Sequence, residues 1–213
     1  MLNKELLKGL YVLTDATLTP TETMLEQVER VLKSGVSVIQ YRDKYASEED
    51  AEKQCIRLQA LCDYYEAIFI IDDRLDIAHR INADGLHVGE DDVSYEEARA
   101  LLGTDKIIGV SCYGDIERAK KYANLGADYV AFGSFFPSPT KPLAKVVDPE
   151  VLKVAKEQMS VPICAIGGIN PSNSKVLKEN GATFIALSSA IWNLNDNIER
   201  VAQLNTMLQM MYQ

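Results

Sequence analysis

Short apolar runs recur along this chain, and each is followed by a segment with helical spacing. This alternation limits the folds that the sequence can adopt, because β-branched and aromatic runs favour strands whereas a 3.6-residue period favours helices. Eight strand–helix units in one chain predict a single α/β domain over residues 1–213, built as a closed (β/α)8 TIM barrel. The runs lie at 10–15, 36–41, 67–72, 85–89, 107–111, 129–135, 162–167 and 184–188.

Residues at the ends of the expected helices agree with this organisation. The segment 19–22 predicts a helix that starts with Thr19 as N-cap and Pro20 in its first turn, and Ser94 with Glu97 forms a capping-box pattern. Glycines are expected to end helices at 35, 103, 126 and 181. An open doubly wound sheet is the alternative, but the segment 15–18 lacks the glycine-rich first turn typical of that fold.

Charge and composition restrict the partners. The formal net charge of −9 argues against nucleic acid or an anionic membrane as the main partner. No run reaches the roughly 18–20 apolar residues of a membrane span, and the N-terminus lacks the pattern of a signal peptide. The four cysteines have no metal or redox spacing. We therefore expect a soluble, cytoplasmic protein; the sequence leaves its oligomeric state open.

The end of the second apolar run carries a cationic row. Gln40, Arg42 and Lys44 are two residues apart, and in a strand such residues face the same side. Active sites of barrels lie at the carboxyl ends of the strands, so this row predicts a diphosphate-binding site. The alternative is a surface row of ion pairs with Asp43 and Glu48.

Carboxylates follow the next two runs. Asp72 and Asp73 end the third run, and Asp91 and Asp92 follow the fourth. Oxygen ligands at neighbouring strand ends suit Mg²⁺, which usually takes one or two carboxylates together with substrate phosphates. Acidic residues that begin helices are the alternative, since they are common and mildly stabilising there.

The last three strand ends have the features of a second phosphate site. The loop after the sixth run combines hydroxyls and a lysine with prolines, Gly167 and Gly168 follow the seventh run, and Ser188 and Ser189 follow the eighth. Glycines and a helix start in this region form the usual phosphate site of such barrels. Neither histidine belongs to a catalytic triad pattern, so the sequence predicts electrostatic, metal-assisted chemistry.

From Leu10 to Ile191 the chain resembles the thiamine phosphate synthase family. The resemblance rests on Gln-x-Arg-x-Lys at 40–44, Asp73 with Asp92, Gly-Val-Ser at 109–111, Ser-Pro-Thr-Lys at 138–141 and Ala-Ile-Gly-Gly-Ile at 165–169. The family joins a hydroxymethylpyrimidine diphosphate to a thiazole phosphate and releases pyrophosphate. Its mechanism is a dissociative, Mg²⁺-assisted substitution that needs no nucleophile on the protein.

The resemblance assigns a role to each candidate residue. Arg42, Lys44 and Lys141 would hold the diphosphate, and Asp73 and Asp92 would bind Mg²⁺. Gln40, Asp72 and Ser111 would contact the pyrimidine or its diphosphate. The thiazole phosphate would lie among Ser138, Thr140, Gly168, Ser188 and Ser189.

Three positions depart from the family pattern. Asp72 replaces the usual Asn, Ser138 replaces Thr, and Ser134 stands where synthases often have Pro. Related thiazole tautomerases have a His at the position of Ser134 and lose part of the diphosphate-binding set, so this chain resembles the synthases more closely. A tautomerase-like isomerase and a non-catalytic binder of thiamine intermediates are the alternatives, with a generic phosphosugar enzyme as the wider class.

Overall fold

The computed structural model describes residues 2–138, 145–194 and 197–213. Its eight strands are all parallel and form a closed barrel, because β1 pairs with both β2 and β8. This closure confirms the predicted barrel and excludes the open sheet. The strands are β1 Gly9–Leu13, β2 Val38–Tyr41, β3 Ile68–Asp72, β4 Gly85–Val88, β5 Ile107–Tyr113, β6 Tyr129–Phe132, β7 Ile163–Ile166 and β8 Phe184–Leu187.

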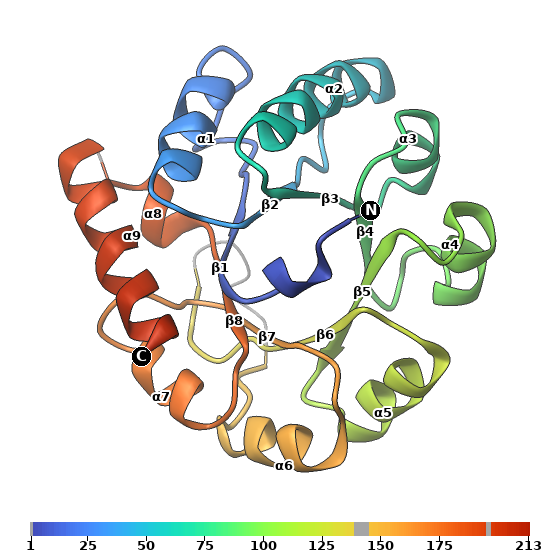
Figure 1. The fold of residues 1–213 in the computed structure, drawn as a ribbon, viewed down its shortest axis with the longest axis vertical. Helices are drawn as coiled ribbons and strands as arrows, with labels where there is room; N and C mark the ends of the chain where they lie inside the picture. The colour runs from blue at the N-terminus through green and yellow to red at the C-terminus, as the bar shows by residue number, and fades with distance from the viewer. Residues whose placement is uncertain (1, 139–144, 195–196) are drawn as a thin grey trace.

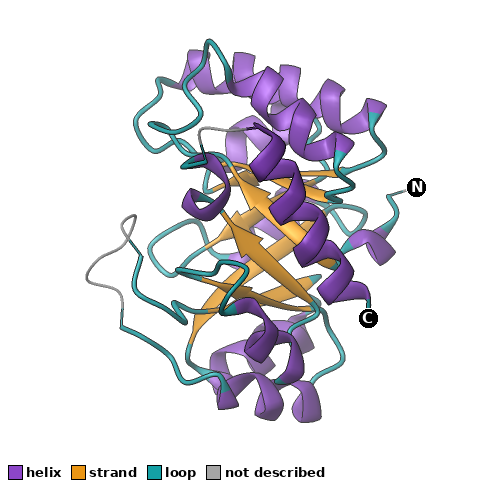
Figure 2. Cartoon of the chain, turned by 90° about the vertical axis from the view of Figure 1, so that its left-hand side faces the viewer, coloured by secondary structure: helices purple, strands orange, loops and turns teal. Residues whose placement is uncertain are grey.

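Helices surround the barrel on all sides (Figure 1), and the side view shows the strands enclosed between them (Figure 2). A short 3-10 helix, η1, spans Lys4–Leu6 ahead of β1. The α-helices are α1 Met24–Lys33, α2 Glu48–Tyr64, α3 Leu75–Arg80, α4 Tyr95–Leu102, α5 Ile116–Leu125, α6 Glu150–Gln158, α7 Ser174–Glu179, α8 Ser189–Trp192 and α9 Asn197–Tyr212.

Two hydrophobic clusters result from the alternation of side chains along the strands. In β1, Leu10 and Val12 belong to the large cluster between the strands and the helices, whereas Tyr11 and Leu13 belong to the cluster inside the barrel. Burial on both faces explains why the strands read as nearly continuous apolar runs. The interior of the barrel is thus a packed core.

Several expected helix ends are confirmed, and one start is wrong. The capping box of Ser94 and Glu97 is present, and Gly126 ends α5 in the left-handed conformation. The helix expected to begin at Thr19 and Pro20 begins instead at Met24. The hydroxyl of Thr19 bonds the backbone of Asp15, accepting from its N–H at 2.9 Å and donating to its carbonyl at 2.8 Å. Thr19 therefore closes a loop instead of capping a helix.

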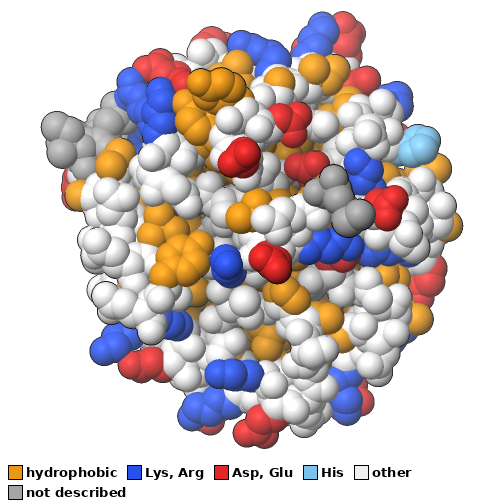
Figure 3. Space-filling view, viewed as in Figure 1, with side chains coloured by type: hydrophobic (Ala, Val, Ile, Leu, Met, Phe, Trp, Pro, Cys, Tyr) orange, Lys and Arg blue, Asp and Glu red, His pale blue; other side chains and the backbone are white. Residues whose placement is uncertain are grey.

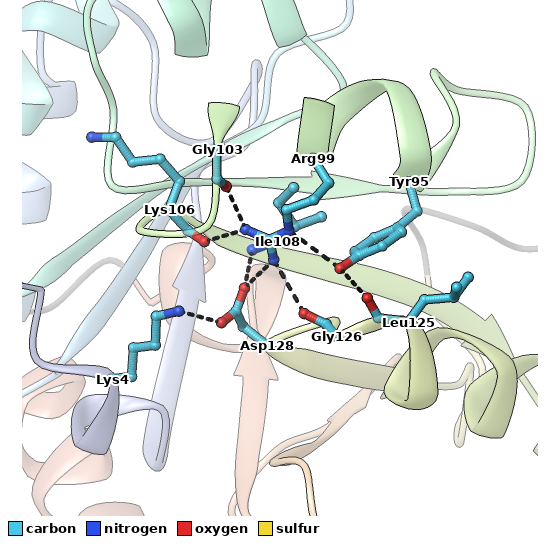
Figure 4. A network of polar contacts seen from close by, with 9 residues as sticks. All are labelled: Lys4, Tyr95, Arg99, Gly103, Lys106, Ile108, Leu125, Gly126 and Asp128. Atoms are coloured by element: carbon cyan, nitrogen blue, oxygen red, sulfur yellow. Dashed lines mark hydrogen bonds and ion pairs between the residues drawn. The ribbon is translucent and has the colours of Figure 1, made fainter. Parts of the chain in front are cut away.

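The amino-terminal end of the barrel is closed by a polar network around Arg99 (Figure 4). The guanidinium donates to the carbonyls of Gly103, Lys106 and Gly126, and its Nη2 lies 2.7 Å from Asp128 Oδ2. Asp128 also accepts from Lys4 Nζ of η1, at 2.6 Å. Figure 1 shows η1 in front of the barrel opening at this end.

No helix in the described part of the chain combines the length and the apolar character needed to cross a bilayer. The face seen in Figure 3 mixes Lys and Arg with Asp and Glu. Cys55, Cys62, Cys112 and Cys164 are all buried as free thiols, as core residues would be.

Candidate active site

Charged side chains from three consecutive strand ends meet at the carboxyl end of the barrel. Arg42 and Lys44 follow β2, Asp72 ends β3 with Asp73 next to it, and Asp92 lies in the loop after β4. A cavity of about 230 Å³ opens here, lined by Asp43, Lys44, Asp72, Asp73 and Arg74. A larger hollow, of about 450 Å³, lies between the ends of α5 and α6, away from these residues.

Two ion pairs connect the cationic row to the acidic side chains. Arg42 Nε lies 3.4 Å from Asp72 Oδ2, and Lys44 Nζ lies 2.6 Å from Asp73 Oδ2. The sequence predicted that Gln40, Arg42 and Lys44 would form one row at the end of a strand. The strand ends at Tyr41, and Gln40 is instead buried inside the barrel, where its Nε2 donates to the Tyr11 hydroxyl at 2.6 Å.

Asp72 is the most strongly perturbed of the carboxyls. Burial, and then the charge of neighbouring Asp73, raise its pKa to about 7, although Arg42 and Lys44 act in the opposite direction. A carboxyl with this pKa is partly protonated near neutral pH. The Asn that the resemblance leads us to expect at this position would be neutral and similar in shape.

Asp73 and Asp92 form a close pair of carboxyls. Burial acts to raise the pKa of Asp73, but its contacts with Asp92 and Lys44 outweigh burial and lower it. The pKa of Asp92 is raised by burial and then by Asp73, while the Gly89 N–H, 2.7 Å from Asp92 Oδ2, favours the ionised form. A pair of facing carboxyls is unfavourable without a cation or a shared proton.

The backbone around Asp73 holds this pair in place. Asp73 has a φ of 64°, in the left-handed region that aspartate tolerates better than most residues. Its N–H donates to the carbonyl of His87 at 3.1 Å, which ties the end of β3 to β4. A strained residue held by its neighbours is typical of functional sites.

Ser111 and His87 lie on the inward faces of β5 and β4. His87 Nε2 is 2.8 Å from Ser111 Oγ, and His87 Nδ1 is 2.8 Å from the Tyr129 hydroxyl. Both ring nitrogens of His87 are therefore engaged in hydrogen bonds inside the barrel. Tyr11 and Tyr129 were not identified from the sequence, because they look like ordinary apolar strand residues. The only available signal was that both are expected to face the barrel interior, as Gln40 and Ser111 do.

The ends of β7 and β8 contain the expected phosphate-site residues. Gly168 has a φ of 63°, and a Cβ there would lie 2.5 Å from the carbonyl oxygen of Pro137, so the loop after β6 packs directly against it. Ser188 is the N-cap of α8, which starts at Ser189. Ser138 is half-buried at the edge of the described loop. Thr140 and Lys141 lie outside the described residues.

Two contacts hold α8 in place behind these serines. The indole Nε1 of Trp192 donates to the Leu13 carbonyl at 2.6 Å, which fastens α8 to β1. Buried Arg200 of α9 donates to the carbonyls of Ile191 and Leu194, at the end of α8. The short helix is thus fixed at the strand end by its own side chain and by a cation from the next helix.

Comparison with known proteins identifies relatives over nearly the whole chain. A family model described as thiamine monophosphate synthase matches residues 10–191. A thiamine-phosphate synthase of Alcanivorax borkumensis is 43% identical over 190 residues, covering 89% of this chain and 88% of the relative. One from Janthinobacterium sp. is 45% identical, covering 91% and 93%.

A solved structure extends the similarity to three dimensions. Thiamine phosphate pyrophosphorylase from Pyrococcus furiosus superimposes with a TM-score of 0.88 at 33% sequence identity. The match covers 99% of this chain and 100% of the other. The two structures therefore share the full barrel.

Proposed function

The chain belongs to the thiamine monophosphate synthase family, and we propose that the carboxyl end of its barrel is where that family's reaction takes place. The activity is that of a thiamine-phosphate synthase, a transferase that joins a hydroxymethylpyrimidine diphosphate to a thiazole phosphate. The observation that carries the location is the meeting of Arg42 and Lys44 with three carboxyls at neighbouring strand ends. Such a cluster suits a phosphorylated ligand and a cation together.

Arg42 and Lys44 are proposed to hold the diphosphate. Both are only partly exposed, with 22% and 49% of their side chains accessible, and both now pair with carboxylates. A diphosphate offers more negative charge and more acceptor oxygens than one carboxylate, so it competes well for these donors. Lys141, placed with them by the resemblance, remains a prediction.

The paired carboxyls of Asp73 and Asp92 fit a magnesium ion. In the described part of the chain, no group of three or more His, Cys, Asp or Glu side chains is arranged to hold a metal. Mg²⁺ commonly takes one or two carboxylates and completes its shell with water and substrate phosphate, so a pair is sufficient. Mg²⁺ bound here would supply positive charge to the leaving pyrophosphate.

The second phosphate site is proposed at the ends of β7 and β8; β8 pairs with β1, which lies between β8 and β2. Gly168, which packs against the loop after β6, is proposed to offer its backbone N–H, and Ser188 and Ser189 add hydroxyls at the start of α8. Ser138 and Thr140 would approach from the loop after β6. Two phosphate sites on different strands place the two reactants in one barrel mouth.

The proposed reaction needs orientation more than it needs acid or base catalysis. The carbon–oxygen bond to the diphosphate breaks first, and the electron pair leaves with pyrophosphate. The aminopyrimidine then carries the positive charge, and the thiazole nitrogen supplies the electron pair of the new carbon–nitrogen bond. Arg42 and Lys44 stabilise the leaving group, while Gln40, Asp72 and Ser111 orient the pyrimidine.

The tautomerase-like alternative is not favoured by the geometry of Ser134. Its hydroxyl donates to the Phe136 carbonyl at 2.8 Å and therefore shapes the loop. A hydroxyl engaged in this way is a poor substitute for the histidine of the tautomerases. The second alternative, a binder without turnover, is separated from the transferase by assay.

The test is product formation from the two phosphorylated substrates with and without Mg²⁺. Wild-type protein is expected to form thiamine phosphate only with Mg²⁺, and Asp92→Asn to lower turnover by about 100-fold or more, since several kcal/mol of charge stabilisation is lost. Exposed Asp91 next to it is the control, and Asp91→Asn should change turnover by no more than about twofold. Binding of both substrates without product would refute the transferase, and equal losses in the two variants would refute the metal site.

A further inference from the structure

A continuous row of hydrogen bonds crosses the interior of the barrel beneath the site. Gln40 Nε2 lies 2.6 Å from the Tyr11 hydroxyl, and the Tyr11 hydroxyl lies 2.9 Å from that of Tyr129. The Tyr129 hydroxyl is 2.8 Å from His87 Nδ1, and His87 Nε2 is 2.8 Å from Ser111 Oγ. We call Tyr11, Tyr129 and His87 the interior relay. It connects two proposed substrate contacts, Gln40 of β2 and Ser111 of β5.

The relay is held rigidly by the packing of the core. Tyr11 and Tyr129 are 2% and 0% exposed, and their rings meet edge to face at 5.9 Å. The ring of Tyr129 also stacks on His87 at 5.6 Å. Burying hydroxyls in an apolar core is costly unless each is bonded, and the row satisfies this requirement.

Gly109 makes the space that the relay needs. A Cβ at this position would lie 1.9 Å from Cζ and 2.4 Å from the hydroxyl of Tyr129. The ring of Tyr129 therefore crosses the surface of β5 at the one residue without a side chain and reaches His87 on β4. The Gly-Val-Ser segment at 109–111, in the middle of β5, thus has a packing role as well as supplying Ser111.

The order of donors along the row follows from its first bond. The Gln40 amide nitrogen can only donate, so Tyr11 accepts there and gives its own hydrogen to Tyr129. Tyr129 in turn gives its hydrogen to His87 Nδ1, which must carry a lone pair. His87 is then protonated on Nε2 and donates to Ser111, which is left with a hydrogen to donate. Burial raises the pKa of both tyrosines well above the ordinary value, so both hydroxyls keep their hydrogens.

We propose that Tyr11, Tyr129 and His87 are positioning residues that fix, through one ordered row of hydrogen bonds, which atoms of Gln40 and Ser111 face the pyrimidine substrate. With this polarity Gln40 presents its carbonyl oxygen as an acceptor, and Ser111 presents its hydroxyl as a donor. This pair suits a ring that carries an amino group and a ring nitrogen, as an aminopyrimidine does. The inference rests on the proposed function for its substrate, but its hydrogen-bond order belongs to the protein alone.

The order can be measured without any substrate. The chain has two histidines, His79 and His87, and His79 is exposed on α3. Nitrogen-15 NMR of histidine-labelled protein, with His79→Gln for assignment, reports which nitrogen of His87 is protonated. The proposal expects the Nε2–H form in the wild type and loss of this single form in Tyr129→Phe. An Nδ1–H form would mean that the Gln40 amide is turned over and every bond reversed, which would overturn the proposal.

Kinetics tests the functional half of the proposal. Tyr129→Phe keeps the ring but breaks the row, and it is expected to raise KM for the pyrimidine diphosphate roughly tenfold while leaving KM for the thiazole phosphate unchanged. Tyr95→Phe is the matched control, because buried Tyr95 also uses its hydroxyl, donating to the Leu125 carbonyl at 3.0 Å, but at the opposite end of the barrel. Tyr95→Phe should lower thermal stability without changing either KM.

The outcomes separate this proposal from the proposed function. If the wild type binds the pyrimidine diphosphate but does not turn it over, the dissociation constant from calorimetry replaces KM and should show the same tenfold difference. If wild type is active and Tyr129→Phe behaves like Tyr95→Phe, the relay has only a structural role and the proposal is wrong. A loss of affinity for both substrates alike would also refute it.

Discussion

The network at the amino-terminal end of the barrel gives a stability prediction that can be worked out bond by bond. Asp128 accepts from Ile108 N at 2.8 Å, from Arg99 Nη2 at 2.7 Å and from Lys4 Nζ at 2.6 Å (Figure 4). Its side chain is only 9% exposed, and that of Arg99 is 17% exposed. Replacing Asp128 by Asn keeps the volume but removes the charge that faces two cations.

The expected cost of Asp128→Asn is about 2 kcal/mol. Hydrogen bonds to a charged group are worth roughly 1.5–3 kcal/mol and neutral ones roughly 0.5–1.5, so neutralising the acceptor of Arg99 loses about 1 kcal/mol. Turning the new NH2 group towards Lys4 or Arg99 adds a similar penalty. The cost stays below the roughly 3–5 kcal/mol of a fully stranded buried ion, because Arg99 keeps three backbone carbonyls.

Lys4→Ala tests the same network from its exposed side. The Lys4 side chain is 41% exposed, so solvent screening should limit its cost to about 0.5 kcal/mol. In a chain of this size 1 kcal/mol corresponds to roughly 2–4 °C, so Asp128→Asn should lower the thermal midpoint by about 4–8 °C and Lys4→Ala by about 1–2 °C. Calorimetry and urea unfolding would measure both, with activity per folded molecule unchanged in each. An equal loss of stability in the two variants would refute the argument that the buried contacts of Asp128 contribute more stability than its exposed contact with Lys4.

Three further predictions concern the carboxyl end and the interior. Asp72 has a pKa raised to about 7, so the folded wild type binds this proton more tightly than the unfolded chain and loses stability as pH rises between about 4 and 7. Relative to the wild type, Asp72→Asn should therefore become more stable by on the order of 2 kcal/mol between pH 5 and pH 8, measured by thermal unfolding in the presence of a chelator. The same stability difference between the two proteins at both pH values would contradict this. Gly109→Ala should displace the Tyr129 ring and raise KM for the pyrimidine diphosphate as Tyr129→Phe does. An unchanged KM would mean that the ring can reach His87 without the space at Gly109. Lys44→Gln should raise KM for the pyrimidine diphosphate about tenfold. Lys53→Gln, on the exposed face of α2, is the control and should leave this KM unchanged. The same KM in both variants would show that Lys44 does not bind the diphosphate.

The barrel could be predicted because several local signals agree. Each apolar run is β-branched or aromatic, and many of the intervening helices carry caps that the sequence shows directly, such as Ser94 with Glu97. The wrong helix start at Thr19 has a local cause: the same hydroxyl can cap a helix or bond its own loop, and the bond to Asp15 prevails. Sequence spacing alone does not decide between these two uses.

The sequence predicted the charged residues of the site but not the hydrogen-bonded tyrosines inside the barrel. Arg42, Lys44, Asp73 and Asp92 stand at strand ends, where period and topology place them together. The contact between Tyr11 and Tyr129 joins residues 118 positions apart, and nothing local in the sequence indicates it. Gln40 was expected beside Arg42 because a strand alternates, but the strand ends at Tyr41 and the alternation ends with it.

Both ends of the barrel carry aspartates next to lysine and arginine, but the two ends differ in how far the negative charge is compensated. At the amino-terminal end, Asp128 lies between Arg99 and Lys4, so its charge is compensated within the chain. At the carboxyl end, Asp72, Asp73 and Asp92 face only Arg42 and Lys44 among the described residues that pair with them, and two of the carboxyls contact each other. Such an arrangement costs stability in the free protein, because burial and mutual repulsion both act against ionised carboxyls. A divalent cation and a diphosphate bound together would remove that cost, and the strain therefore favours ligand binding at this end of the barrel over a purely structural role.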